Sequence, residues 1–196
     1  MEIEVKLLNI DPQEIREKLS AAGCTQTGYE FQQNRMYDFH DRRLYEQEDG
    51  SYIRIRQMRD LATGRQKSLL TLKKTVSRDQ FKIADETETL VDDPEMMESF
   101  LLKLGFVRIR IDEKIRETWQ MPGLHFEIDE WAGMPPYLEV EAADQETVTQ
   151  GLALLGFSMQ DTTAMNLREV LALYKIESDS LQFKDFGRKI PGERQA

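Results

Sequence analysis

Charged residues in this sequence recur at every second position, in short runs that alternate with aliphatic residues. Glu2 and Glu4 share one such run, and Glu139 and Glu141 share another. Because successive side chains of a β-strand point to opposite faces, each pair of carboxylates lies on one face of a strand. Carboxylate pairs of this kind would hold a hard divalent cation such as Mg²⁺ or Mn²⁺, which prefers oxygen ligands.

Basic residues follow the same two-residue spacing. Arg54 and Arg56 flank a single isoleucine, and Lys114 and Arg116 flank another. Arg and Lys bind phosphate oxygens, and the planar guanidinium of Arg makes bidentate contacts with oxyanions. Two like charges about 7 Å apart on one strand face repel each other. A face that only meets water would more often mix its charges, so the repeated pairs favour a bound polyphosphate.

A simpler explanation applies to any one of these strands. An antiparallel sheet commonly buries one face and leaves the other in water, where charges need no function. The like-charged pairs, the use of Arg and the presence of eight strands, which suffice to close a barrel, together favour an enclosed channel. The charges would then face inward, and the aliphatic residues would face outward beneath amphipathic helices. Enclosed charges need partners, which salt bridges, a polyphosphate and metal ions would supply.

The channel requires strands and covering helices, and the hydrophobic pattern predicts both. The segments that alternate with a period of two residues, and so predict strands, are residues 2–8, 34–39, 51–58, 68–75, 80–91, 107–120, 124–131 and 137–142. Helices are predicted over residues 12–22, 94–104, 145–155 and 167–176, the first three between an aspartate N-cap and a glycine. In the second helix we expect five apolar residues to pack against the core: Met96, Met97, Phe100, Leu101 and Leu104.

The composition of the 196 residues is that of a soluble globular protein, with 40% hydrophobic and 32% charged residues. No apolar run approaches the ~20 residues of a membrane span, and the first residues lack a secretion signal. The net charge of −10 argues against nucleic-acid and acidic-membrane partners. With Cys24 as the single cysteine, we expect a reducing, cytoplasmic location and no disulfide or thiolate zinc site. We predict one domain over residues 1–176 and a polar tail over residues 177–196.

Several short motifs occur along the chain in a fixed order. They are Glu2-Ile3-Glu4-Val5-Lys6, Tyr52-Ile53-Arg54-Ile55-Arg56, Leu70-Thr71-Leu72-Lys73, Glu86-Thr87-Glu88, Lys114-Ile115-Arg116 with Trp119, Ile128-Asp129, and Leu138-Glu139-Val140-Glu141. The first motif has the pattern E-x-E-x-K. The ordered set resembles the CYTH superfamily, also called the triphosphate tunnel metalloenzymes, over roughly residues 1–175.

This resemblance implies an α+β fold, with a closed eight-stranded antiparallel β-barrel that forms a tunnel and amphipathic helices packed outside. It also implies activity on triphosphates with Mg²⁺ or Mn²⁺. The residues that it implies as metal ligands are Glu2, Glu4, Glu88, Asp129, Glu139 and Glu141. The residues that it implies as binding the triphosphate are Lys6, Arg54, Arg56, Lys73, Lys114 and Arg116, of which Lys6, Arg54, Lys73 and Arg116 are expected to take part in catalysis.

One position departs from the family's pattern, and one further role is not fixed by a motif. Relatives often have a Gly-Leu-Gly turn before the last strand, where this chain has Gly133-Met134-Pro135-Pro136. Some relatives also use a lysine near the C-terminus. Lys175 is a candidate for that role, although no motif fixes it.

The expected activity is hydrolysis of the phosphoanhydride of inorganic tripolyphosphate, thiamine triphosphate or a nucleoside triphosphate. An adenylate cyclase that forms cyclic AMP and pyrophosphate from ATP is the alternative, because the same tunnel would bind its triphosphate. A third possibility is a module that binds polyphosphate without catalysis. Such a module would need the basic residues but not all the pairs of acidic residues. We expect a small-molecule triphosphate as partner. The choice of triphosphate and of metal, and the oligomeric state, a homodimer included, are left open.

Overall fold

A computed structural model describes residues 2–47 and 50–190, without the side chains of Glu2, Gln47 and Arg78. The strands are β1 (Glu2–Leu8), β2 (Thr25–Phe39), β3 (Tyr52–Asp60), β4 (Gln66–Arg78), β5 (Lys82–Leu90), β6 (Phe106–Met121), β7 (Leu124–Trp131), β8 (Tyr137–Ala142) and β9 (Ser180–Leu181). The α-helices are α1 (Pro12–Ala21), α2 (Arg43–Gln47), α3 (Pro94–Lys103), α4 (Gln145–Leu154) and α5 (Leu167–Leu173). Within the described ranges, no helix combines the length and the apolar character needed to cross a membrane.

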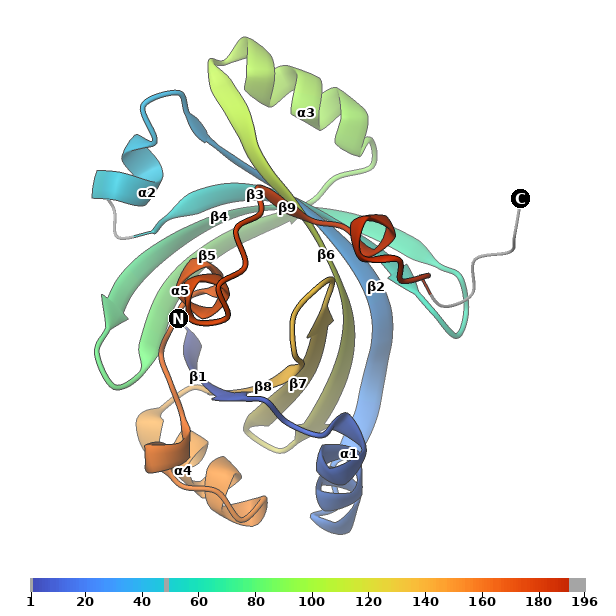
Figure 1. The fold of residues 1–196 in the computed structure, drawn as a ribbon, viewed down its shortest axis with the longest axis vertical. Helices are drawn as coiled ribbons and strands as arrows, with labels where there is room; N and C mark the ends of the chain where they lie inside the picture. The colour runs from blue at the N-terminus through green and yellow to red at the C-terminus, as the bar shows by residue number, and fades with distance from the viewer. Residues whose placement is uncertain (1, 48–49, 191–196) are drawn as a thin grey trace.

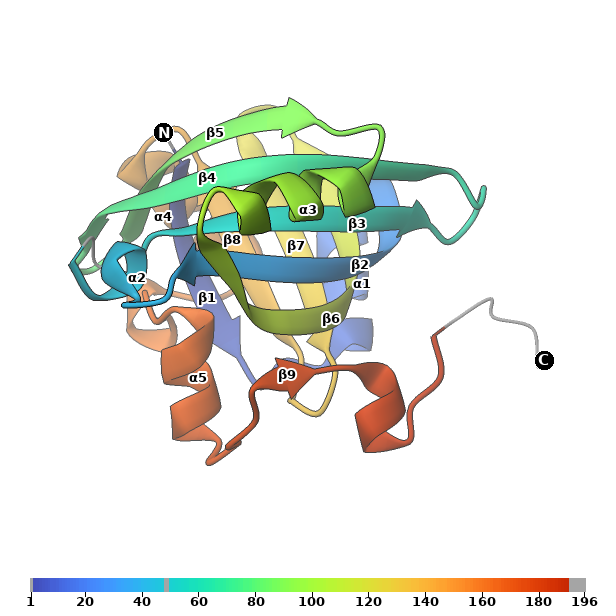
Figure 2. The ribbon, with the colours of Figure 1, turned by 90° about the horizontal axis from the view of Figure 1, so that it is seen from above.

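Strands β1 to β8 form a closed antiparallel barrel, which Figure 1 shows as a ring. Around the ring the order is β2-β3-β4-β5-β1-β8-β7-β6, and β6 pairs again with β2 to close it. The closing pair extends from Thr25 opposite Gln120 to Phe39 opposite Phe106. The short β9 lies outside the ring and runs parallel to β6 (Figure 2). The predicted eight-stranded closed barrel with helices outside is therefore confirmed.

Strand β2 is much longer than the segment predicted from the sequence. The prediction covered residues 34–39, whereas β2 begins at Thr25. The added residues are mostly Thr, Gln and Glu, so they lack the aliphatic alternation that marks a strand. Gln32 of this added part and the neighbouring Asn34 are nevertheless buried. Their polar side chains suit a strand whose buried face lines a polar interior.

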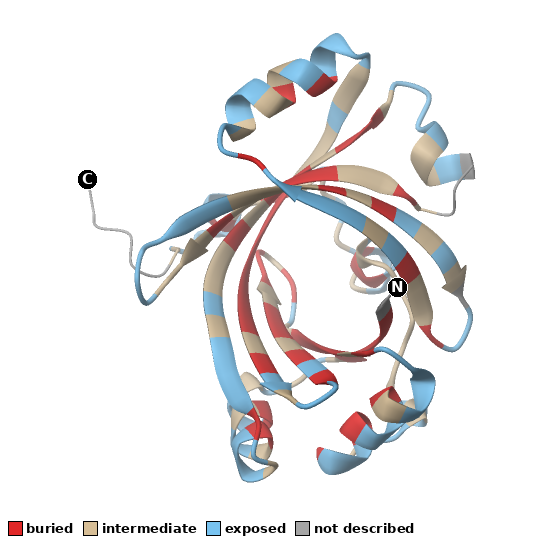
Figure 3. Cartoon of the chain, turned by 180° about the vertical axis from the view of Figure 1, so that it is seen from behind, coloured by how far each residue is buried: buried red, intermediate tan, exposed pale blue. Residues whose placement is uncertain are grey.

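Helices α1 and α4 cover the outer faces of β1, β7 and β8, and this packing forms the main hydrophobic core. Ile15 and Leu19 of α1 and Val148 and Leu152 of α4 are at most 1% exposed in this core. The red bands in Figure 3 mark the buried residues of these strands and helices. Because aliphatic residues alternate with charged ones, burying the outer face under helices turns the charged face into the barrel. The predicted aliphatic-out, charge-in arrangement holds for most of the barrel, but near the start of β6 Ile109 lines the interior and Arg108 pairs with Glu98 of α3 outside it.

Helix α3 packs on the barrel through a narrower face than the sequence predicted. Leu101 is buried and Met97 is partly buried, against β3 and β6. The expectation that Met96, Phe100 and Leu104 also pack against the core is wrong, because these side chains are 65%, 57% and 58% exposed. Ion pairs of the helix with the barrel hold the face that carries Leu101 inward, which leaves the neighbouring apolar face in solvent.

The C-terminal segment packs along the outside of the barrel. Leu181 and Phe183 are buried, and their backbone N–H groups donate to the carboxylates of Asp112 and Glu113 of β6. Gly133, in the loop where the chain departs from the family's pattern, lies against the ring of Phe186. Residues 180–186 of the predicted polar tail are thus attached to the barrel, whereas residues 191–196 lie outside the described part of the chain.

Candidate active site

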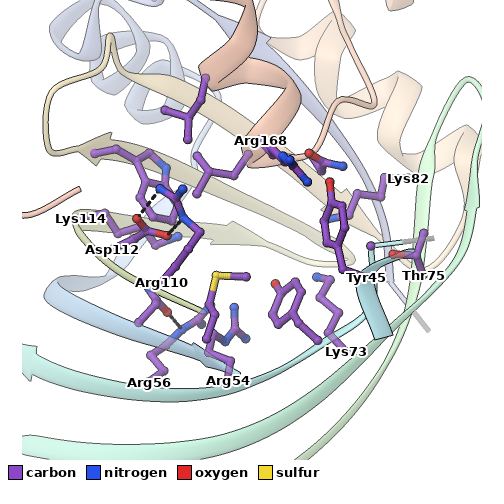
Figure 4. Close-up of a pocket in the computed structure, with 18 of the residues that line it drawn as sticks. Tyr45, Arg54, Arg56, Lys73, Thr75, Lys82, Arg110, Asp112, Lys114 and Arg168 are labelled. Carbon is purple, nitrogen blue, oxygen red and sulfur yellow. Dashed lines mark hydrogen bonds and ion pairs between the residues drawn. The ribbon is translucent and has the colours of Figure 1, made fainter. Parts of the chain in front are cut away.

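The interior of the barrel contains a cavity of about 520 Å³. Residues from all eight strands of the ring line it, and Tyr45 of α2 and Arg168 of α5 border it (Figure 4). The lining residues of each strand are mainly every second residue, as strand geometry requires. The charged positions scattered along the sequence therefore converge on one enclosed space.

The cavity gathers most of the residues that the sequence predicted for function. All six predicted triphosphate-binding residues line it: Lys6, Arg54, Arg56, Lys73, Lys114 and Arg116. Four of the predicted metal ligands line it too: Glu4, Glu88, Glu139 and Glu141. Asp129 is fully buried outside the lining, and the Glu2 side chain is outside the described residues. Lys175 is exposed beyond α5 and is not a lining residue.

Ion pairs neutralise part of the charge in the cavity. The Nζ atom of Lys6 lies 2.7 Å from Oε1 of Glu4 and 3.0 Å from Oε1 of Glu139. Lys82 approaches the same oxygen of Glu4 to 2.8 Å. Burial disfavours ionisation of Glu4, but Lys6 and Lys82 hold its pKa well below the ordinary value. Both partners of the Lys6–Glu4 pair are therefore charged at neutral pH.

A second set of cations in the cavity has fewer counter-ions. Arg56 donates from Nε to the amide oxygen of Asn34 at 3.0 Å. Burial, together with the neighbouring Arg54 and Arg116, lowers the pKa of Arg56 to about 10. Burial and Arg116 likewise lower the pKa of Lys114 to about 8. Crowded, buried positive charge of this kind is relieved by a bound anion.

A cluster of carboxylates lies in the same cavity. Glu127, Glu139 and Glu141 each place an oxygen within 4.8 Å of the other two. Burial raises the pKa of Glu127 to about 7; Arg116, its ion-pair partner, opposes this, and Glu139 adds to it. Burial, Glu127 and Glu139 also raise the pKa of Glu141 well above the ordinary value. Glu139 is neutralised by Lys6 and Arg116, whereas Glu127 and Glu141 are short of positive charge, which a divalent cation would supply.

A family model described as the CYTH domain matches residues 1–164. This chain belongs to the CYTH domain family. Members of the CYTH family are metal-dependent enzymes, either triphosphatases or adenylate cyclases. The barrel with a cavity lined by paired basic and acidic residues is thus the tunnel of a CYTH protein.

Proteins similar to this CYTH chain are known from several organisms. A candidate adenylate cyclase of Methanocaldococcus jannaschii is 23% identical over 186 residues, which cover 95% of this chain and 96% of that protein. The structure of the PH1012 protein of Pyrococcus horikoshii matches with a TM-score of 0.72 and 22% identity, over 87% of this chain and 99% of that one. The structure of HpAC1, a candidate adenylyl cyclase from Hippeastrum described as revealing a dominant triphosphatase activity, matches with a TM-score of 0.64 and 22% identity over 100% of both chains. At these identities the structural likeness establishes the fold.

The carboxylates of this CYTH chain fit the metal that its family requires. Glu127, Glu139 and Glu141 offer only oxygen donors, which suit Mg²⁺ and Mn²⁺. Glu127 was not among the predicted ligands, although it shares a strand face with Asp129, which was. The structure distinguishes the two, because Asp129 accepts hydrogen bonds from Lys114 and Arg116 and is not part of the cluster.

Other residues of the cavity were also missed. Lys82 and Glu86 of β5 line it, and Glu86 pairs with Lys73. Tyr52 of β3 lines it as well. The alternation along β5 places Lys82 and Glu86 on the same face as Glu88, but only Glu88 was predicted to have a function. The pairing of β5 with β1 brings Lys82 opposite Glu4, which only the strand register reveals.

The rim of the cavity comes from two segments far apart in the sequence. Asp38 is fully buried and accepts hydrogen bonds from the N–H groups of Leu44 at 3.1 Å and Tyr45 at 3.0 Å, which fixes the start of α2. The guanidinium of Arg168 lies 5.1 Å from the ring centre of Tyr45. Helix α2 has five residues, too few for a periodic pattern, so the sequence did not predict it.

Proposed function

We propose that this CYTH protein is a metal-dependent triphosphatase that hydrolyses a phosphoanhydride bond inside the barrel. One observation carries the proposal. The same cavity contains cations that are short of counter-ions, namely Arg56 and also Lys114, which shares the carboxylate of Asp129 with Arg116. It also contains carboxylates that are short of cations, Glu127 and Glu141. A triphosphate with a divalent cation complements both sets at once, and neither ligand alone does so.

The basic residues would hold the phosphate chain. Arg54, Arg56 and Arg116 are planar guanidiniums that can each contact two phosphate oxygens, and Lys6, Lys73 and Lys114 act as point charges. Their side chains come from β1, β3, β4 and β6, so they approach the cavity from several sides. Contacts from several sides fix both the position and the direction of the phosphate chain.

The carboxylates of Glu127, Glu139 and Glu141 would hold the metal. A bound Mg²⁺ or Mn²⁺ would screen the phosphate charges and stabilise the charge that develops during transfer. The pairing of Glu139 with Lys6 and Arg116 places part of the cluster next to the phosphate-binding cations. The two halves of the site are therefore adjacent.

The proposed reaction breaks the bridging P–O bond of the terminal phosphate. A water molecule attacks the terminal phosphorus, a new P–O bond forms, and the diphosphate leaves with the electron pair of the broken bond. The proton that the water loses passes to solvent. The guanidiniums and ammonium groups stabilise the charge on the transferring and leaving oxygens.

A class IV-type adenylate cyclase is the second candidate. The cavity extends past the phosphate-binding residues to Tyr45 and Arg168, where an aromatic ring and a guanidinium could contact a nucleoside. In that reaction the ribose 3′-hydroxyl would attack the α-phosphate of ATP, with release of pyrophosphate. The similar proteins from Methanocaldococcus jannaschii and Hippeastrum are both described as candidate cyclases, and the Hippeastrum protein is also described as having a dominant triphosphatase activity.

Product identification separates these functions. The protein is incubated with tripolyphosphate, thiamine triphosphate and ATP, each with Mg²⁺ and with Mn²⁺, and the products are resolved by ion chromatography. A triphosphatase releases orthophosphate and leaves the diphosphate, whereas a cyclase converts ATP to cyclic AMP and pyrophosphate. Thermal stabilisation by a triphosphate without turnover under either metal would overturn both and favour a binding module.

A further inference from the structure

Asn34 of β2 is a neutral polar residue on the inner wall of the barrel. It lines the cavity and is only 3% exposed. In the strand register it lies opposite Arg56 of β3 on one side and Asp112 of β6 on the other, and both of these residues line the cavity as well. Because paired residues of neighbouring strands point to the same face of a sheet, the side chain of Asn34 points into the barrel.

The hydrogen bond with Arg56 fixes the orientation of this amide. Nε of Arg56 lies 3.0 Å from Oδ1 of Asn34. Nε of an arginine can only donate, so the branch of the amide that meets it must be the oxygen. The amide nitrogen, Nδ2, is then the other branch of the side chain. Its two N–H groups need acceptors elsewhere.

The amide nitrogen finds no acceptor among its protein neighbours. Nδ2 of Asn34 is buried and makes no hydrogen bond within the described part of the chain. The carboxylate of Asp112, across the pair of β2 and β6, is instead bonded to Arg110, whose Nε and Nη2 donate to its two oxygens at 2.9 and 2.8 Å. A buried donor without an acceptor is costly, so native proteins rarely keep one unless water or a ligand satisfies it.

The surroundings of Nδ2 favour an anion as the missing acceptor. Arg54 lies two residues from Arg56 on the same face of β3, and its Nε is likewise buried without a hydrogen-bond partner in the described ranges. Figure 4 shows these two arginines together on one side of the cavity. This part of the wall therefore offers both N–H donors and positive charge. Phosphate oxygens accept hydrogen bonds and carry negative charge, so they match both properties.

We propose that Nδ2 of Asn34 donates a hydrogen bond to an oxygen of the bound triphosphate, beside the guanidinium of Arg56. This inference rests on the proposed function only in requiring that a triphosphate occupies the cavity. The neutral amide adds a hydrogen bond without adding to the repulsion between Arg54 and Arg56. A lysine or arginine in place of Asn34 would instead put a third positive charge beside those two.

Isothermal titration calorimetry of the full chain with tripolyphosphate tests the proposal, in EDTA so that no metal-dependent hydrolysis takes place. Asn34→Ala removes the donor and should raise the Kd about 10-fold or more. Asn34→Asp keeps an oxygen acceptor for Arg56 but replaces the N–H groups by an anionic oxygen, so it should raise the Kd at least ~100-fold. Gln57→Ala is the matched control and should leave the Kd unchanged, because Gln57 is not a lining residue and accepts from Arg35 instead.

A double-mutant cycle with Arg56→Gln separates direct contact from positioning. If Asn34 contacts the phosphate itself, Asn34→Ala weakens binding by a similar factor in the wild type and in the Arg56→Gln variant. If Asn34 only orients Arg56, the effect of Asn34→Ala disappears in the Arg56→Gln variant, and the proposal is overturned. Thermal unfolding without ligand checks that each variant is folded. Asn34→Asp takes the place of Asn34→Ala in the cycle if the alanine variant does not fold.

The wild type separates failure of this hydrogen bond from failure of the proposed function. Asn34 variants that bind tripolyphosphate as tightly as a binding-competent wild type would overturn the hydrogen bond and leave the triphosphatase in place. A wild-type protein that does not bind tripolyphosphate at all would overturn both.

Discussion

Arg116 and Asp129 meet through two parallel hydrogen bonds inside the barrel. Nε of Arg116 lies 2.7 Å from Oδ1 of Asp129, and Nη2 lies 2.6 Å from Oδ2. Lys114 donates to Oδ2 of the same carboxylate at 2.7 Å. Asp129 is fully buried, so these two cations are its partners in place of water. We therefore expect Asp129 to orient Arg116 and Lys114, and we place the metal at the neighbouring carboxylates.

Asp129→Asn should destabilise the fold. The amide keeps the size of the side chain but removes the buried negative charge between Arg116 and Lys114. Breaking a buried pair in this way costs about 3–5 kcal/mol of unfolding free energy. Urea denaturation measures the loss. Glu130→Gln, on a partly exposed carboxylate of the same strand, is the control and should change stability by less than about 1 kcal/mol. Equal effects of the two variants would contradict the positioning role.

Arg56→Gln should weaken substrate binding without weakening the fold. Arg56 lies among other cations, which lower its pKa, so removing its charge relieves repulsion in the free protein. Loss of a charge-assisted contact to phosphate should raise KM for tripolyphosphate about 10- to 100-fold. Steady-state kinetics and urea denaturation together test this. The exposed Arg65→Gln is the matched control. An unchanged KM with a large loss of stability would show that Arg56 is structural.

Replacing two carboxylates of the cluster should remove the response to metal. In the wild type, Mg²⁺ at about 100 times its Kd should stabilise the fold by about 2.7 kcal/mol, a rise in Tm of roughly 5–10 °C. Glu127→Gln with Glu141→Gln should abolish this rise. Without metal, the variant should be at least as stable as the wild type, because two crowded carboxylates are gone. Differential scanning calorimetry measures both, and a rise in Tm retained by the variant would place the metal elsewhere.

Tyr52 should ionise at lower pH than an ordinary tyrosine. Burial opposes its ionisation, but Arg54, Lys73 and Lys82 outweigh burial and lower its pKa. Burial raises the pKa of Tyr174 instead. In an ultraviolet titration, Tyr52→Phe should therefore remove the component at lowest pH, and Tyr174→Phe should not. Tripolyphosphate without metal should move that component to higher pH, because it neutralises the same cations. A titration that tripolyphosphate leaves unchanged would place the phosphate away from Tyr52.

The alternation of aliphatic and charged residues predicted the strands of the barrel, except for the first part of β2. Each pair such as Arg54 and Arg56 lies on one strand face, and the outer aliphatic face needs helices to cover it. The helix N-caps could be predicted in the same way, because each cap bonds to a residue close to it in the sequence. Asp93 accepts from the N–H of Met96, and Asp144 accepts from the N–H of Thr147. These features depend on neighbours in the sequence, so they could be predicted without a structure.

The features that the sequence did not reveal concern contacts between distant segments. Glu127 and Asp129 share a strand face and both pair with Arg116, but only Asp129 also accepts from Lys114, and only Glu127 belongs to the carboxylate cluster. Phe100 and Leu101 are neighbours on α3, and the buried pair of Arg35 with Glu98 decides which of them faces the barrel. Local pattern does not encode such pairings, because they follow from the strand register and the docking of each helix.

Phosphorus NMR of tripolyphosphate with the protein and Mg²⁺ tests the central claim most directly. The signal of the substrate's central phosphorus should disappear as pyrophosphate and orthophosphate appear in equal amounts. The Glu127→Gln and Glu141→Gln double variant should leave the tripolyphosphate intact. A wild-type protein that leaves tripolyphosphate unchanged under both Mg²⁺ and Mn²⁺, or a double variant as active as the wild type, would contradict metal-dependent cleavage in this cavity.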